Sequence, residues 1–286
     1  MSGFVITIVL FAALFHATWN ALVKGAQDRT ITIGLVALGH VIPGVILVYM
    51  FAAPSFESIK FIIASTIIHW LYYYLLNIAY RYGDLSVVYP ISRGLTPIII
   101  ALGAQYWIGE VLPTAAWLGI ITISIGVIIV SWDSISKKMP YMGLLAAAGL
   151  AIVISAYSTV DGVGVRISNN SMAYIGWLFI AEIFVVIFVF SSRWSRLAKL
   201  PVKQSMLGIL GGVMSGTAYG MVLYAQTLAP LGIVSAVRET SVIFAAIIGV
   251  YFFREGKWPV RLLAASAVGL GIILIAFGTQ VDTLHG

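Results

Sequence analysis

The sequence predicts an all-α integral membrane protein with ten transmembrane helices, arranged as two inverted five-helix repeats around a central cavity. Three observations lead to this fold class. The 286 residues are 61% hydrophobic and 9% charged, with a mean hydropathy of +1.04, whereas a soluble domain normally has about 25% charged residues. The apolar residues occur in runs of about 20, the length that crosses a hydrocarbon core of about 30 Å. The third observation is an internal repeat with an offset of 145 residues.

Short breaks with charged residues, proline or glycine separate the apolar runs. A transmembrane β-barrel would need strands of about ten residues with alternating polarity, so continuous runs of twice that length favour helices. The loops are too short for a soluble domain, and residues 1–286 are expected to form a single transmembrane domain. The predicted spans are 3–24, 30–53, 58–81, 84–108, 114–133, 141–163, 172–192, 204–227, 230–253 and 258–278.

The repeat relates the third, fourth and fifth spans to the eighth, ninth and tenth. An offset of 145 residues places Arg93 on Arg238, and it also aligns these pairs: Tyr74 with Tyr219, Ile98 with Ile243, Ala101 with Ala246, Tyr106 with Tyr251, Glu110 with Glu255, Leu118 with Leu263, and Gly126 with Gly271. Because the unit has five spans, an odd number, the second copy enters the membrane from the opposite side. We therefore expect inverted repeats at 1–137 and 138–286, with a binding site near the midplane between them.

The basic residues predict the orientation of the chain. Loops after the odd-numbered spans hold twelve Lys and Arg residues, whereas the opposite loops and the termini hold only Lys60 and Arg166. Because cytoplasmic loops are enriched in Lys and Arg, both termini are expected outside the cytoplasm. The net charge of +6 therefore comes from loop residues that orient the helices in the membrane, and no nucleic-acid partner is expected.

Several kinds of site are excluded by composition. The chain has no cysteine, which excludes disulfides, thiol catalysis and thiolate zinc sites. The four histidines are dispersed, and no acidic pair has metalloprotease spacing. The sequence also lacks a phosphate-binding glycine loop, so ATP is not expected to drive the protein directly. We expect no metal and no cofactor.

Two arginines lie deep in apolar spans, where a guanidinium is costly. Pro90 and Pro97 flank Arg93 and are expected to disturb the helix on both sides of it, whereas Arg238 directly precedes Glu239. A planar guanidinium suits a carboxylate or phosphate, so at least one arginine is a candidate substrate ligand. A structural ion pair, or bonds to carbonyls of a broken helix, is the alternative. We expect Arg93 to meet the substrate, and Arg238 to be held largely by Glu239 or by backbone carbonyls.

Polar and aromatic side chains at helical spacing predict the lining of a cavity. His16, Trp19 and Asn20 share one face of the first span, although hydrogen bonds between helices would also explain them. For the tyrosines, core packing is the alternative. The candidate substrate-binding residues are His16, Trp19, Asn20, Tyr73, Tyr74, Asn77, Tyr89, Arg93, Tyr157, Tyr219, Tyr224, Arg238 and Glu239.

Titratable residues within the spans are candidates for proton coupling. His16 has an ordinary pKa of about 6.5, and Glu239 neighbours a buried arginine. Asp161 lies near a span end, where a helix cap or an ion pair is an equal alternative. Glu182 lies near the middle of its span with no obvious partner, where a neutral, hydrogen-bonded carboxyl is the alternative to a coupling site, and Glu110 is expected to be structural. The proton-coupling candidates are therefore His16, Asp161 and Glu239.

Over its whole length the chain resembles the drug/metabolite transporter superfamily, EamA type. Three stretches carry the resemblance: His16–Lys24, Tyr89–Pro97 (Tyr-Pro-Ile-Ser-Arg-Gly-Leu-Thr-Pro), and Arg238–Ser241 continuing to Arg254–Glu255. The resemblance implies ten helices in two inverted repeats, with a cavity lined by helices 1, 3, 4, 6, 8 and 9. Every polar cluster above except Glu182 falls on those helices.

The resemblance also implies a secondary transporter rather than an enzyme. Members export metabolites across the inner (plasma) membrane by alternating access, and this chain is similar to the amino-acid exporter branch. Deep arginines and an aromatic lining favour an apolar or aromatic amino acid as substrate. The alternatives are another anionic or zwitterionic metabolite, or multidrug efflux, although the first span lacks the carboxylate that small multidrug relatives use. The expected partners are a small-molecule substrate and membrane lipid, and a monomer is expected. Proton coupling and uniport both stay open.

Overall fold

The chain is all-helical in the computed structural model, which describes residues 1–82, 85–130, 141–253 and 258–285. Only the backbone is described for residues 77, 79–82, 85–90, 130, 250, 252–253, 258 and 279–285. These parts of the chain contain no strand, which confirms the all-α prediction.

Helices occupy each of the ranges that were predicted to be apolar spans. They are α1 (Gly3–Val23), α2 (Arg29–Met50), α3 (Phe56–Tyr82), α4 (Leu85–Ile108), α5 (Thr114–Val130), α7 (Tyr141–Ile167), α8 (Ser171–Ala181), α9 (Ile183–Leu197), α10 (Val202–Gln226), α11 (Leu231–Arg238), α12 (Ser241–Phe253) and α13 (Trp258–His285). Within the described residues, eight helical stretches are long and apolar enough to cross a membrane. The molecule is therefore a multi-pass membrane protein.

Two of the expected spans are each made of two helices. Span 172–192 is divided at Glu182 into α8 and α9, and span 230–253 is divided at Glu239 and Thr240 into α11 and α12. By contrast, α4 is one continuous helix from residue 85 to 108. The disturbance expected from Pro90 and Pro97 therefore does not divide the helix that carries Arg93. The interrupted helix is the one that carries Arg238, and it contains no proline at the break.

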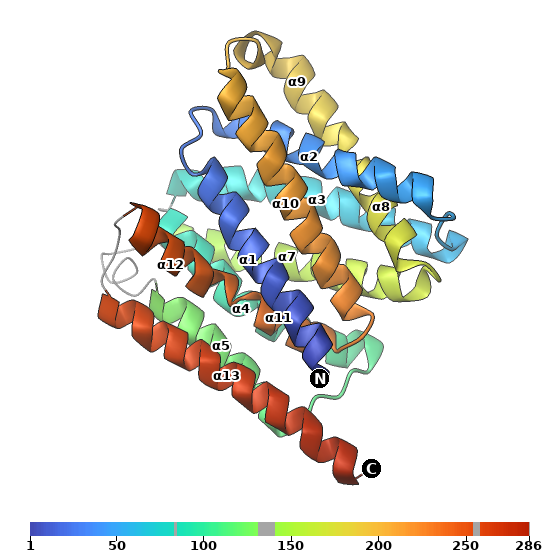
Figure 1. Cartoon of the computed structure of the whole chain (residues 1–286), viewed down its shortest axis with the longest axis vertical. Coiled ribbons are helices and arrows are strands. Elements are labelled where there is room, and N and C mark those ends of the chain that lie inside the picture. The colour runs from blue at the N-terminus through green and yellow to red at the C-terminus, as the bar shows by residue number, and fades with distance from the viewer. Residues whose placement is uncertain (83–84, 131–140, 254–257, 286) are drawn as a thin grey trace.

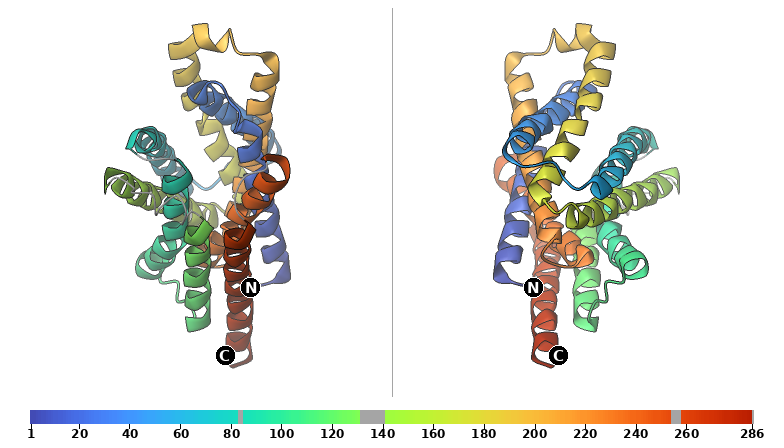
Figure 2. Two further views of the ribbon diagram at one scale, coloured as in Figure 1. Left: turned by 90° about the vertical axis from the view of Figure 1, so that its left-hand side faces the viewer. Right: turned by 90° about the vertical axis from the view of Figure 1, so that its right-hand side faces the viewer.

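The helices pack as pairs that join the two halves of the sequence. Figure 1 shows α5 beside α13 and α1 beside α10, and α3 likewise contacts α7. The α5–α13 pair projects from one end of the molecule, with the C-terminus at its tip, while α9 lies at the other end (Figures 1 and 2). The largest buried apolar cluster lies among α1, α5, α10, α11 and α13. Neither half therefore encloses its own core.

Glycines allow the closest approach between α2 and α10. A Cβ atom placed on Gly39 would lie 2.5 Å from the Cα of Gly212 and 2.7 Å from the backbone nitrogen of Val213. Small residues let helix backbones approach closely in membranes. At this crossing the two backbones are in contact, and no side chain separates them.

A polar clasp of Glu110 and Arg166 fixes the start of α11. The Arg166 guanidinium donates from Nε to the carbonyl of Gln226 (2.7 Å) and from Nη2 to the carbonyl of Ala229 (2.9 Å). Carbonyl groups at or just beyond the C-terminal end of a helix have no partners within the helix, so these bonds satisfy them. Nη1 of Arg166 lies 2.6 Å from Oε1 of Glu110, whose Oε2 accepts the backbone N–H of Leu231 at 2.9 Å. Both ends of the α10–α11 turn are thereby capped by side chains from α7 and from the end of α4.

Replacing Arg166 with Ala is expected to lower the free energy of unfolding by about 1–3 kcal/mol, since the charge-assisted bonds to Glu110 and to two carbonyls are lost together. The matched control is Arg196→Ala. Arg196 is also paired, at 2.5 Å to Asp28, but its side chain is 55% exposed, compared with 29% for Arg166. An exposed pair contributes less than about 1 kcal/mol. Reversible unfolding in detergent micelles compares the two variants, and equal effects would contradict a clasp.

Candidate functional site

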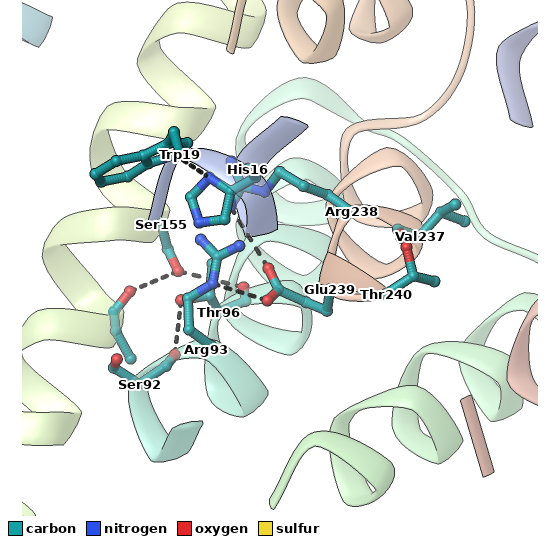
Figure 3. A network of polar contacts seen from close by, with 11 residues as sticks. His16, Trp19, Ser92, Arg93, Thr96, Ser155, Val237, Arg238, Glu239 and Thr240 are labelled. Carbon is teal, nitrogen blue, oxygen red and sulfur yellow. Dashed lines mark hydrogen bonds and ion pairs between the residues drawn. The ribbon is translucent and has the colours of Figure 1, made fainter. Parts of the chain in front are cut away.

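Two arginines and one glutamate form a buried charged site where α4 meets α11 (Figure 3). Nε of Arg93 lies 2.8 Å from Oε2 of Glu239, and Nη2 of Arg238 lies 3.6 Å from Oε1 of the same carboxylate. The arginine side chains are 5% and 6% exposed and the glutamate side chain is fully buried. One arginine comes from each half of the chain, and a single carboxylate lies between them.

The break between α11 and α12 presents Arg238 and Glu239 to the site. The backbone N–H groups of Glu239 and Thr240 bond to the carbonyls three residues before them, at 3.0 and 3.1 Å. This tighter turn interrupts the α-helix and places the two neighbouring side chains around the same point. Helices broken at depth are typical of binding sites in membrane transporters.

The pairing of Glu239 differs from the expected one. Glu239 was expected to hold Arg238, but its closer partner is Arg93, on the facing helix. Nε of Arg238 is buried and has no hydrogen-bond partner among the described residues. Arg238 therefore has donor capacity left for another oxyanion.

Polar residues of α1 lie beside the charged site. Figure 3 shows His16 next to the guanidinium groups, and both arginines are within electrostatic range of its ring. Nε1 of Trp19 donates to Nδ1 of His16 at 3.3 Å, and Nδ2 of Asn20 donates to the His16 carbonyl at 2.8 Å. The three residues thus form one polar face of α1, as their spacing predicted.

Hydroxyl groups that were not identified from the sequence join α4 to α7. Oγ of Ser155 donates to the carbonyls of Ala151 (2.7 Å) and Thr96 (3.3 Å), and Oγ1 of Thr96 donates to the Ser92 carbonyl at 2.8 Å. Thr96 and Ser155 are buried. They position the turn of α4 that carries Arg93. Single hydroxyls in an apolar run give no sequence signal that separates this role from a lipid-facing one.

A second polar cluster surrounds Asp161 on α7. Its two carboxylate oxygens accept from the hydroxyls of Tyr174 (2.9 Å) and Tyr219 (2.6 Å). The Tyr157 ring stacks on His69 with 4.1 Å between centroids, and the Tyr219 ring lies edge-on to both. Tyr157 is also within electrostatic range of Arg93 and Arg238, so the two clusters are neighbours.

His69 is a member of this cluster that sequence analysis missed. Its Nδ1 lies 2.9 Å from the Ser65 carbonyl and 3.2 Å from the Ser65 hydroxyl. The signal was available, because Ser65, His69 and Tyr73 follow one another at intervals of four residues and therefore share a face of α3. Tyr73 itself donates to Glu182 across 3.5 Å.

Other candidate residues are not brought to either cluster. The Tyr74 side chain is 64% exposed on the outer surface of α3. Tyr224 is half-buried, and its side chain makes no polar contact with the described residues. The side chains of Asn77 and Tyr89 lie outside the described residues, as does Glu255. The repeat relates Tyr74 to Tyr219, but only the latter turns inward.

The charged site suits an anion better than a metal. Guanidinium groups offer only donors, and no group of three metal-ligating side chains occurs in the described part of the chain. A carboxylate or phosphate oxygen matches Nε of Arg238, while the aromatic cluster beside it matches an apolar body.

Comparison with known proteins supports the fold. No protein-family model and no curated protein sequence matches the chain. Among solved structures, the crystal structure of another protein superposes with a TM-score of 0.73, over 97% of this chain and 98% of its own, at 15% sequence identity. The two proteins therefore share a fold along almost their whole lengths, and the likeness extends no further than the fold.

Proposed function

We propose that this protein is a secondary transporter that exports a small zwitterionic or anionic metabolite, foremost an amino acid with an apolar or aromatic side chain, by alternating access across the inner membrane. The observation that carries the proposal is the buried site of two guanidinium groups and one carboxylate, in which Nε of Arg238 has no hydrogen-bond partner among the described residues. Intramembrane charges of this kind mark substrate paths.

The charge of the site favours a substrate with one negative group. Arg93 and Arg238 together carry two positive charges, and Glu239 supplies one negative charge. A substrate carboxylate at Arg238 would balance the remaining positive charge and would use the fork geometry of the guanidinium. The adjoining rings of Tyr157 and His69 offer an aromatic surface to the apolar part of the substrate.

The proposed architecture has ten spans in two inverted repeats, at 1–137 and 138–286. Helix packing supports it, because exchanging the halves preserves several of the main contacts: α3 packs on α7 as α10 packs on α1, and α4 packs on α7 as α12 packs on α1. The extensive α2–α10 contact has a smaller counterpart, between α3 and α8. The α5–α13 pair maps onto itself. Arg93 and Arg238 are mates under the same exchange, so an axis relating two inverted halves would pass through the charged site, where transporters built from inverted repeats bind their substrates.

The test is counterflow in proteoliposomes that contain the purified full-length chain. Vesicles are loaded with unlabelled Phe, Met or Thr and diluted into the labelled amino acid. Transient uptake above protein-free vesicles is expected. Absence of counterflow for any amino acid would contradict an amino-acid transporter, and resistance to lipophilic cations in its place would favour multidrug efflux.

Arg238→Ala is expected to reduce counterflow by at least about thirtyfold, because losing a buried charged contact costs about 2 kcal/mol or more. Arg238→Lys should restore little activity, since Lys lacks the fork. Arg196→Ala, which removes an arginine from an exposed pair, is the control and should transport as the native protein does. Full activity of folded Arg238→Ala would remove this residue from the site.

A further inference from the structure

Asp161 is a fully buried carboxyl group that the proposed substrate site does not use. Its exposed fraction is 0%. Three hydroxyl groups surround it, those of Tyr174 on α8, Tyr219 on α10 and Ser65 on α3. Each comes from a different helix, so the carboxyl group lies where α3, α8 and α10 meet α7.

No lysine or arginine among the described residues lies within ion-pair distance of Asp161. Several titratable side chains face this region from the packed helices. They are His69 and Tyr72 on α3, Tyr157 on α7, Tyr174 on α8, Tyr219 on α10 and Glu182 at the end of α8. Arg93 on α4 and Arg238 on α11 are within electrostatic range of Tyr157, and Arg238 is also within range of Tyr219. A buried carboxylate without a cation is costly. The hydroxyls of Tyr174 and Tyr219 cover the two oxygens of Asp161. A proton is small enough to bind there, whereas a substrate ammonium group would have to displace both rings.

We propose that Asp161 is the proton-binding site that couples this transporter to the proton gradient. The inference rests on the proposed function for its consequence, since coupling requires transport, but proton binding itself can be measured without a substrate. The driving ion and the substrate would thus bind in two separate clusters, the proton at Asp161 and the substrate at Arg238.

The other candidates for proton coupling are less suitable. Glu239 is already paired with two guanidinium groups, so its protonation would leave both arginines without their shared carboxylate. His16 lies beside the same two arginines, which disfavour a further positive charge there. Glu182 lies in the break between α8 and α9, and among the described side chains its hydrogen-bond partner is Tyr73, at 3.5 Å.

Tyr219 connects Asp161 to the substrate site. Its hydroxyl donates to Oδ2 of Asp161 at 2.6 Å. When Oδ2 takes up a proton from water, that oxygen becomes the donor, and the Tyr219 hydroxyl must accept this bond and direct its own hydrogen elsewhere. The Tyr219 ring lies 6.1 Å from Tyr157 and 6.2 Å from His69, centroid to centroid. Protonation of Asp161 therefore reverses the direction of the hydrogen bond to Tyr219, whose ring lies against Tyr157, and Tyr157 is within electrostatic range of Arg238.

Infrared difference spectroscopy of the full-length protein in lipid tests proton binding directly. A protonated-carboxyl C=O band should appear and disappear as pH is scanned across neutrality, and it should be absent in Asp161→Asn. Glu182→Gln identifies any band from the half-buried Glu182 carboxyl and should leave the Asp161 band in place. Tyr219→Phe keeps the carboxyl but removes a donor to its charged form, so the band should persist to higher pH. A pH-dependent carboxyl spectrum that is identical in the native protein and Asp161→Asn would overturn the proposal.

Transport of labelled L-phenylalanine tests coupling. A gradient of one pH unit should drive about tenfold accumulation if one proton exchanges for one substrate. Asp161→Asn should keep counterflow but accumulate no substrate above equilibrium. Accumulation by this variant at the native level would overturn coupling through Asp161. If the native protein shows no counterflow, the proposed function fails, and the infrared titration still decides whether Asp161 binds a proton.

Discussion

Replacing Glu239 with Ala is expected to lower the free energy of unfolding by about 3–5 kcal/mol, because the change leaves two buried guanidinium groups without their shared carboxylate. Arg93 and Arg238 are both almost fully buried. Neither can lose its charge, because a guanidinium group stays protonated in proteins. The attraction to Glu239 offsets part of their desolvation in the folded state. Without it, the same desolvation remains unopposed.

The measurement is reversible unfolding of the purified variant in mixed micelles of mild detergent and dodecyl sulfate. Glu57→Ala is the control, since Glu57 is an exposed glutamate in the first turn of α3, and it should change stability by less than about 0.5 kcal/mol. Glu239→Gln keeps the shape and loses the charge, so its effect should lie between the two. A loss below about 1 kcal/mol for Glu239→Ala would show that other groups hold the arginines.

Replacing Gly212 with Ala is expected to destabilise the protein by about 1–3 kcal/mol, because the new methyl group has no space at the crossing of α2 and α10. A Cβ on Gly212 would overlap the carbonyl oxygen of Val36 and lie 2.7 Å from the Cα of Gly39. Both obstacles are backbone atoms, which no rotamer change can move. The two helices must therefore separate, and this shifts the part of α10 that carries Tyr219.

Gly269→Ala is the matched control for this substitution. Gly269 is also a helical glycine, in α13, but a Cβ there would meet nothing within 4 Å. Alanine favours a helix over glycine, so this variant should be neutral or slightly more stable. Thermal unfolding of the two variants in the same detergent gives the comparison. If both retain native stability, the α2–α10 contact is looser than its geometry implies.

The sequence predicts helix positions well and helix interruptions poorly. Apolar length determines where a span lies, and each predicted range is occupied by helix. Proline was the only interruption signal used, and it indicated α4, where Arg93 lies in a continuous helix. The real break at Glu239 lacks proline. At this break Glu239 pairs with Arg93 of α4, which is a tertiary interaction that local sequence does not record.

The charged site could be predicted from its residue types, but its pairing could not. Two deep arginines related by a repeat indicate a shared location, since the axis of the repeat brings mates together. The choice of Arg93 over Arg238 as the closer partner of Glu239 depends on about an ångström of helix placement. Asp161 and Tyr219 are far apart in sequence, and only the packing of α7 against α10 brings them into contact.

The single carboxylate between the two arginines also has an electrical consequence. The repeat places Glu239 opposite Gly94, where a Cβ would lie 2.8 Å from the Ile128 side chain, so no second acidic side chain fits there. The empty site therefore carries one excess positive charge whichever side of the membrane it faces. In a transporter that alternates as proposed, its return without substrate moves that charge through the membrane field, worth about 2.3 kcal/mol per 100 mV for full passage. Membrane voltage would then act on the return step without substrate. A substrate with one net negative charge would cancel the excess charge of the charged site in the other step, whereas a zwitterion would leave it in place.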